Sequence, residues 1–261
     1  MPPQWKNPSD DPLMGACRFD RREDVAALIV AGADVNRAKK SSGVTPLLVA
    51  CGMGHTEVVG MLLAAGAAVD QSRNDGVTPL YLACQEGHAA TVSALLAAGA
   101  AKDLAANAGL HGRPRQGGLL PMYVACQLGH LSVAQQLSSY GANRQVSEHL
   151  AAEDVAKHFG HTELHAWLVA SRLWSTPLHH LSIISAARAR ALLRDGADVN
   201  AAAVADGPTP LSLALEMRTH GLVRDSSAAQ VLLEAALPTG PPARASGLSQ
   251  RVSTRQLTSG A

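Results

Sequence analysis

An eleven-residue segment recurs along this chain, and this repetition constrains the fold more than any other feature. Residues 45–55 read TPLLVACGMGH, and residues 78–88, which lie 33 positions later, read TPLYLACQEGH. A third copy, residues 120–130 (LPMYVACQLGH), follows at an offset of 42, so nine extra residues precede it. Each copy is followed by an apolar run and then a glycine. A period of this length predicts stacked copies of one small unit rather than a single deep core.

Each unit is predicted to fold as a pair of helices followed by a polar loop. In unit two, Thr45 supplies an N-cap oxygen, and Pro46 occupies the first helical position, where its missing N–H has no cost. Gly54 is expected to end the first helix in the left-handed conformation, and Gly66 to end the second helix in the same way. The polar segment 70–77 is typical of a loop or hairpin.

The composition agrees with thin layers and excludes some classes of partner. Aromatic residues make up 3% of the chain, and Ala50, Ala83 and Ala125 recur where helices of adjacent units approach closely. Because the net charge is +1, we do not expect a strongly basic nucleic-acid-binding protein. No stretch is apolar over the roughly 20 residues that a membrane helix requires, and the first residues lack the apolar core of a signal peptide.

The repeated segments resemble the ankyrin repeat. Thr-Pro-Leu, Gly-His, Leu-Leu and Gly-Ala-Asp-Val-Asn stand at the offsets of that family, whose period is 33 residues. The Leu-His that usually follows Thr-Pro becomes Leu-Leu, Leu-Tyr or Met-Tyr in the copies quoted above, which should leave the fold unchanged. The resemblance implies an all-α fold, an ankyrin-repeat solenoid of stacked helix-turn-helix units with β-hairpin fingers. We count about seven units, irregular after the fifth.

The spacing of the units divides the chain into four predicted parts. Ala151, which opens unit five, lies only 25 residues before Thr176, which opens unit six, so the hairpin between them is missing. We therefore expect a changed stacking angle at this point. The parts are a flexible N-terminus at 1–11, ankyrin repeats 1–5 at 12–172, ankyrin repeats 6–7 at 173–237 and a disordered tail at 238–261.

Four cysteines occupy one repeat position, directly after an alanine of the first helix: Cys17, Cys51, Cys84 and Cys126. Successive helices in a stack lie about 8–10 Å apart, whereas a disulfide requires Cα atoms within about 7 Å. One cysteine per layer therefore suits neither a disulfide nor a zinc site. We expect buried core thiols, which favour a reducing compartment.

Four histidines belong to Gly-His turns and are expected to bond backbone groups of neighbouring layers: His55, His88, His130 and His161. The cluster of His158, His161 and His165 with Glu163 comes nearest to a metal site. Its order differs from His-Glu-x-x-His, and the Gly-His turn interrupts the helix that such ligands would need. The chain has no phosphate-binding loop and no Gly-x-Ser-x-Gly motif. We expect no metal, no other cofactor, no catalytic residues and no enzymatic activity.

The resemblance implies that variable positions on the face formed by hairpin tips and inner helices recognise a partner. A mixed face with few charges suggests a protein or peptide rather than a phosphate-bearing ligand. We expect Tyr81 and Tyr123 to lie exposed on this face, because exposed tyrosines commonly anchor interfaces. The predicted partner-binding residues are Ser42, Val44, Met53, Asn74, Asp75, Val77, Tyr81, Gln85, Glu86, Leu119, Tyr123, Gln127 and Leu128.

The function implied is that of a non-enzymatic protein–protein interaction scaffold, which binds its partner on the concave face. The alternative is a substrate-recognition adaptor of a larger complex such as a ubiquitin ligase, although the polar tail lacks the apolar stripe of a recruiting helix. We expect a cytoplasmic monomer, with the nucleus as an alternative location, and neither a nucleic-acid nor a membrane partner. The long basic hairpin at 103–119, with Arg113 and Arg115, is interpreted as a solvated loop, with an acidic partner as the alternative.

Overall fold

A computed structural model describes residues 11–108, 114–147, 150–173, 176–202, 207–219 and 227–236. The predicted disordered tail and all but the last residue of the predicted flexible N-terminus lie outside these ranges. The predictions for these two segments therefore stay predictions, as does the division of the chain into four parts.

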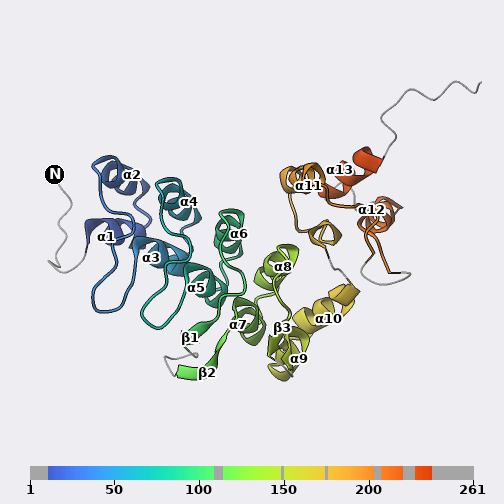
Figure 1. The fold of residues 1–261 in the computed structure, drawn as a ribbon, viewed down its shortest axis with the longest axis horizontal. Helices are drawn as coiled ribbons and strands as arrows, with labels where there is room; N and C mark the ends of the chain where they lie inside the picture. The colour runs from blue at the N-terminus through green and yellow to red at the C-terminus, as the bar shows by residue number, and fades with distance from the viewer. Residues whose placement is uncertain are drawn as a thin grey trace, which may run out of the picture.

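Five helix pairs follow one another through the first part of the described chain (Figure 1). We call the first helix of each pair inner and the second outer. The inner helices are α1 (Pro12–Arg18), α3 (Pro46–Met53), α5 (Pro79–Gln85), α7 (Pro121–Leu128) and α9 (Ala152–His158). The outer helices are α2 (Arg22–Val30), α4 (Thr56–Ala64), α6 (Ala89–Ala97), α8 (Leu131–Ser139) and α10 (Thr162–Ala170).

The pairs stack side by side and make an all-α repeat solenoid, which confirms the predicted fold class. Inner helices pack on inner helices from α1 to α9, and outer helices pack on outer helices from α2 to α8 (Figure 1). A continuous hydrophobic cluster runs through these layers from Leu13 to Leu168. Each layer is thin, so its buried side chains are mostly Ala, Val, Leu and Cys rather than rings.

Loops between the pairs extend beyond the inner-helix row, and two of them contain short antiparallel strands (Figure 1). Strand β1 (Ala106–Ala108) pairs with β2 (Pro114–Leu119), and β3 (Gln145–Ser147) pairs with β4 (Leu150–Ala151). The segment interpreted as a solvated loop is therefore a strand pair, with Ala106 opposite Leu119 and both side chains buried. Its tip, which contains Arg113, lies outside the described residues.

The local signals in the repeat act as the sequence predicts. The Thr45 hydroxyl accepts a hydrogen bond from the Leu48 N–H at 3.3 Å, and the Thr78 hydroxyl accepts one from the Tyr81 N–H at 3.1 Å. These bonds satisfy N–H groups that have no partner within the helix. Gly54 ends α3 with a φ of 73°, in the left-handed region that favours glycine.

The Gly-His histidines join each layer to the one before it, as predicted. Each histidine Nε2 lies within hydrogen-bond distance of a backbone carbonyl at the end of the preceding inner helix. Since a carbonyl only accepts, Nε2 carries the proton in each case. The pairs are His55 with Arg18 O at 3.1 Å, His88 with Gly52 O at 3.2 Å, His130 with Gln85 O at 3.0 Å and His161 with Gln127 O at 2.9 Å.

The glycine of the Gly-His turn has a second role, because the histidine of the next layer lies against it. A Cβ added at Gly54 would lie 2.7 Å from the His88 ring, and one added at Gly129 would lie 2.5 Å from the His161 ring. Real Cβ atoms do not approach so closely. Glycine is therefore required by the layer spacing as well as by its positive φ.

A second hydrophobic cluster, from Leu178 to Leu232, lies beyond the fifth pair. It is built from η3 (Pro177–His179), α11 (Ala186–Arg194), α12 (Pro210–Thr219) and α13 (Ser227–Ala236), and a further short helix, η2 (Ser171–Leu173), follows α10. The helix η3 packs against α8, so the second cluster adjoins the outer helix of the fourth pair (Figure 1).

The expectation of a full inner helix after Thr176 was wrong, because only the short 3-10 helix η3 forms there. Ile183 and Ile184 stand where regular units have the last helical turn, and β-branched residues are weaker helix formers. Ser185 then caps α11 in place of a Gly-His turn, with its hydroxyl accepting from the Arg188 N–H at 3.2 Å.

The two roles of glycine can be separated by comparing Gly129→Ala with Gly160→Ala. Both glycines have nearly the same φ (77° and 78°), but nothing lies within 4 Å of a Cβ at Gly160. We expect Gly160→Ala to cost about 1–2 kcal/mol of unfolding free energy from its backbone conformation alone. Gly129→Ala should cost at least about 1 kcal/mol more, because the His161 ring must move.

Urea unfolding followed by circular dichroism measures both costs. Equal losses in the two variants would show that the histidine contact adds nothing to stability.

Candidate functional site

Each inner helix ends in an exposed side chain, and together these side chains form a row along the stack. We call this set the helix-end row. Each member stands directly before the positive-φ residue that follows an inner helix. The members are Phe19, Met53, Glu86, Leu128 and Phe159. The four apolar members have exposed fractions of 64% (Phe19), 52% (Met53), 39% (Leu128) and 43% (Phe159).

The next layer clamps the backbone on both sides of the middle row members. Met53 lies between Gly52, whose carbonyl accepts from His88, and Gly54, which lies against the same ring. The same arrangement holds for Glu86 and Leu128, with His130 and His161. The backbone at these three positions is therefore fixed. Their side chains take no part in the histidine hydrogen bonds between layers.

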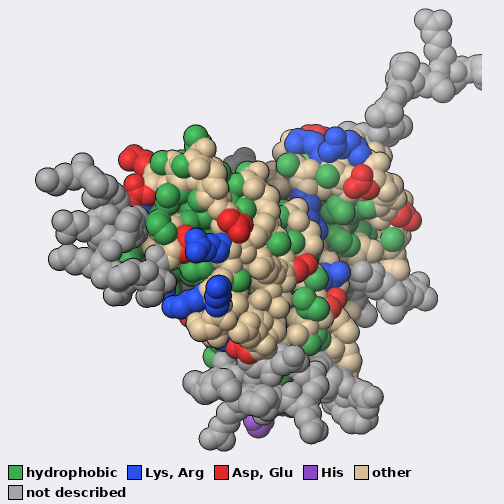
Figure 2. Space-filling view, turned by 60° about the vertical axis from the view of Figure 1, so that its left-hand side comes forward, with side chains coloured by type: hydrophobic (Ala, Val, Ile, Leu, Met, Phe, Trp, Pro, Cys, Tyr) green, Lys and Arg blue, Asp and Glu red, His purple; other side chains and the backbone are tan. Residues whose placement is uncertain are grey.

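The two ends of the row are aromatic and have polar neighbours. The Arg21 guanidinium lies 5.6 Å from the centre of the Phe19 ring, a cation–π distance. The Phe159 ring meets the His158 ring edge to face, with centroids 5.0 Å apart. On the face that Figure 2 shows, charged side chains of both signs are scattered rather than gathered into one field.

The structure distributes the predicted partner-binding residues over three levels of burial. Four are exposed: Met53, Asn74, Glu86 and Leu128. Five are half-buried: Ser42, Val44, Asp75, Gln85 and Gln127. Four are buried: Val77, Tyr81, Leu119 and Tyr123. Of the predicted residues, the exposed and half-buried ones near the ends of α3, α5 and α7 can contact a partner while the protein stays folded.

The expectation that Tyr81 and Tyr123 are exposed was wrong. Their exposed fractions are 1% and 9%, because this position of the inner helix lies between adjacent inner helices of the stack. Burial, together with the nearby Tyr123, raises the pKa of Tyr81 to about 12. Val77 and Leu119, which precede the inner helices α5 and α7, are buried in the same core. These four residues serve the core.

Asn74 and Asp75 are engaged within the protein rather than free for a partner. The Asn74 N–H donates to the Ser42 carbonyl at 3.0 Å, which ties one loop to the loop of the preceding layer. Asp75 accepts from the Val77 N–H at 3.3 Å and forms an ion pair with Arg73. Both residues therefore shape the loop tips before any partner binds.

Phe19 and Phe159 were missed by sequence reasoning. They lie in the first and fifth units, where the repeat motif is degenerate: Asp20 takes the place of the turn glycine in unit one, with a φ of 51°. Aligning the residue before each turn would have revealed them, since all five row members share this position.

Two other features, a metal site and a membrane-spanning helix, are absent from the described residues. Within the described residues, no three His, Cys, Asp or Glu side chains are grouped closely enough to hold a metal ion. The described part of the chain also contains no helix with the length and apolar character needed to cross a membrane.

A stack of helix pairs with projecting loops and an exposed row at the inner-helix ends defines a helical repeat protein. Residues 13–108 match the family model for ankyrin repeats, in three copies, so this part of the chain is similar to that family. A comparison with curated proteins found no match. Ankyrin repeats are generally modules for protein–protein interaction, and the family is typically non-enzymatic.

The four cysteines are buried free thiols, as predicted from their shared repeat position. Burial raises the pKa of Cys126 to about 12, and it raises the pKa values of Cys51 and Cys84 further still. Desolvation disfavours the thiolate, which is the reactive form of cysteine. These thiols are therefore inert core groups rather than nucleophiles.

The raised thiol pKa values predict a loss of stability at alkaline pH. An unfolded thiol has a pKa of about 8.5, so stability due to a buried thiol is complete below this pH and declines as the pH rises towards the folded pKa. At pH 10, Cys51 should contribute about 2 kcal/mol less to the unfolding free energy than at pH 7.5.

Urea unfolding of the wild type and Cys51→Ala at both pH values, under a reducing agent, isolates this effect. The difference in stability between the two proteins should shift by that amount in favour of the variant. An unchanged difference would contradict the assignment of Cys51 as a desolvated thiol.

Proposed function

We propose that this protein is a non-enzymatic interaction scaffold that binds a protein or peptide partner along the helix-end row. The observation that carries the proposal is the repeated exposure of large apolar side chains at one position of successive layers. Phe19, Met53, Leu128 and Phe159 are all exposed. This is notable because aromatic residues make up only 3% of the chain. Exposed apolar surface that recurs in one place marks interaction sites in soluble proteins.

The row favours an extended partner with a mixed apolar and basic character. Successive layers are about 8–10 Å apart, which an extended chain spans in about three residues. Met53 and Leu128 are two layers apart, so apolar partner side chains about six residues apart would meet both. Glu86 lies between them and is exposed, so a basic partner group opposite it would complete the match in charge.

Two half-buried glutamines lie beside the row. Gln85 donates its side-chain N–H to the Glu86 carboxylate at 2.9 Å, which orients that carboxylate towards a partner. The Gln127 side-chain oxygen is buried and has no hydrogen-bond partner among the described residues, so it is not a contact for the partner. An apolar row with flanking amides and one carboxylate has the composition of a protein-binding surface rather than a phosphate-binding one.

Affinity capture from cells with the double variant Met53→Asp and Leu128→Asp tests the proposal. Both side chains are exposed, so the unfolding midpoint should stay nearly unchanged. Partner recovery should fall by at least about tenfold, because two central apolar contacts are replaced by charge. Tyr81→Ala is not a suitable variant, since removing a buried ring would cost about 3–5 kcal/mol of stability.

The matched control is Val169→Asp, which introduces one of these charges at a side chain of similar exposure (40%) on outer helix α10. It should leave partner recovery unchanged. Equal recovery with the folded double variant and with the wild type would remove the helix-end row from the proposal.

A further inference from the structure

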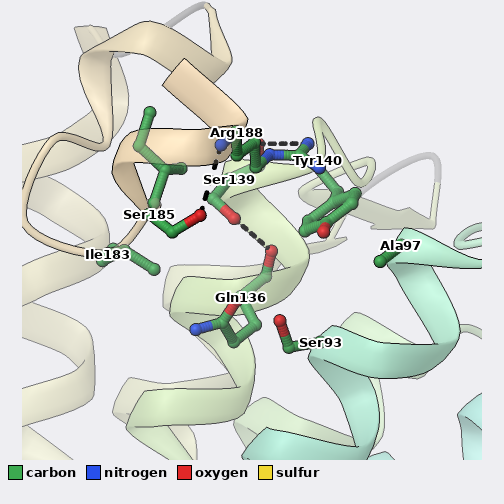
Figure 3. A pocket seen from close by; sticks show the side chains of 9 residues that line it. Ser93, Ala97, Gln136, Ser139, Tyr140, Ile183, Ser185 and Arg188 are labelled. Carbon is green, nitrogen blue, oxygen red and sulfur yellow. Dashed lines mark hydrogen bonds between the residues drawn. The ribbon is translucent and has the colours of Figure 1, made fainter. Parts of the chain in front are cut away.

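A cavity of about 350 Å³ lies where the first helix stack meets the second hydrophobic cluster (Figure 3). Its wall is formed by the outer helices α6 and α8 and by the segment that leads into α11. The lining residues are Ser93, Ala97, Gln136, Ser139, Tyr140, Ile183, Ile184, Ser185 and Arg188. None of them belongs to the helix-end row, so this cavity is separate from the proposed partner surface.

Arg188 is the one cationic residue among those that line the cavity. Its guanidinium carbon lies 3.2 Å from the centre of the Tyr140 ring, and one terminal nitrogen donates to the Ser139 carbonyl at 3.4 Å (Figure 3). Its Nε is buried and has no hydrogen-bond partner in the described part of the chain. The stacking on Tyr140 holds the planar group in one orientation.

The charge of Arg188 is not balanced by the protein. Within the described residues, no Asp or Glu oxygen lies within ion-pair distance of its guanidinium. Desolvation lowers the pKa of Arg188, and the group is only half-exposed. A partly desolvated cation without a counter-ion attracts an anion strongly.

Other groups around the cavity also favour an anion that carries an apolar part. Ser185, which also lines the cavity, is the N-cap of α11, so the positive end of that helix faces the same region. The Ser93 hydroxyl and the Gln136 amide add polar groups on the opposite wall (Figure 3). Ile183, Ile184 and Ala97 provide apolar surface beside them.

We propose that this cavity binds a small organic monocarboxylate, with its carboxylate on the terminal nitrogens of Arg188 and its apolar body against Ile183 and Ile184. A planar carboxylate matches the fork of a guanidinium. Because one cation lines the cavity, a singly charged anion balances it, whereas a phosphate dianion would remain half-compensated. The volume lies at the small end of the range for ligand sites.

The bound ligand would join the two hydrophobic clusters. Arg188 belongs to α11 of the second cluster, while Ser139 and Tyr140 belong to the end of α8 in the first stack. A ligand that touches both sides binds the assembled junction and not the separated parts. It therefore stabilises the junction in proportion to its concentration.

Titration of the full-length ¹⁵N-labelled protein with benzoate, up to about 10 mM, tests the proposal by NMR in a phosphate-free buffer. Amide signals of residues 93, 136, 139–140 and 183–188 should shift together and saturate. Benzamide, a neutral molecule of the same shape, should bind at least about tenfold more weakly, because it lacks the charge that Arg188 recognises.

Three variants sharpen the test. Arg188→Met should weaken benzoate binding by at least about tenfold, while Arg190→Met, an exposed arginine on the same helix that does not line the cavity, should have no effect. Ser93→Leu should abolish binding by filling the cavity from α6 without touching Arg188, and it keeps the test valid if Arg188→Met fails to fold.

Several results would overturn the proposal. These are absence of saturable shifts at the lining residues, equal binding of benzoate and benzamide, unchanged binding in folded Ser93→Leu, or tighter binding of inorganic phosphate than of benzoate.

Discussion

The hydrogen bond from a histidine Nε2 to a carbonyl of the preceding layer is the contact on which the rest of this structure depends. It recurs at His55, His88, His130 and His161, at 2.9–3.2 Å. Each of these histidines is also the N-cap residue of an outer helix, so one residue sets both the start of a helix and the distance to the next layer. At His88, His130 and His161, the turn glycine of the preceding layer has to lack a Cβ because the histidine ring occupies that space. The backbone at the ends of α3, α5 and α7 is thus fixed from both sides, which leaves the intervening side chain available for recognition.

The stack changes character where this contact ends. No histidine ring lies against Gly160, and two arginines make contacts at the junction that follows the fifth pair. The Arg144 guanidinium donates to the Leu168 and Ser171 carbonyls at 3.3 and 3.0 Å and lies over the Trp167 ring. Arg188 then links α11 to the end of α8. Guanidinium contacts span larger gaps than a histidine turn does, and the cavity beside Arg188 is the space that this looser junction leaves.

Much of the fold could be predicted from the sequence, because its signals are local and repeated. The threonine caps, the left-handed glycines, the buried cysteines and the bridging histidines all follow from one unit and its copies. The burial of Tyr81 could not be predicted in the same way, since the position of a residue on a helix does not say what the next layer places over it. The collapse of the sixth inner helix to η3 depends on Ile183 and Ile184 in a unit whose opening Thr-Pro-Leu-His looks regular. For the candidate site, Met53, Glu86 and Leu128 could be predicted because they lie in regular units. Phe19 and Phe159 were not predicted, because the repeat motif is degenerate in their units.

The interlayer bond can be observed directly through the histidine ring protons. An Nε2–H that donates to a carbonyl is protected from exchange with water, so it should give a resolved ¹H–¹⁵N ring signal at neutral pH. The account predicts such a signal for His55, His88, His130 and His161, each lost only when that histidine is replaced by alanine. Ring protons that exchange freely with water, as we expect for the exposed His158, would contradict the claim that these bonds hold the layers together.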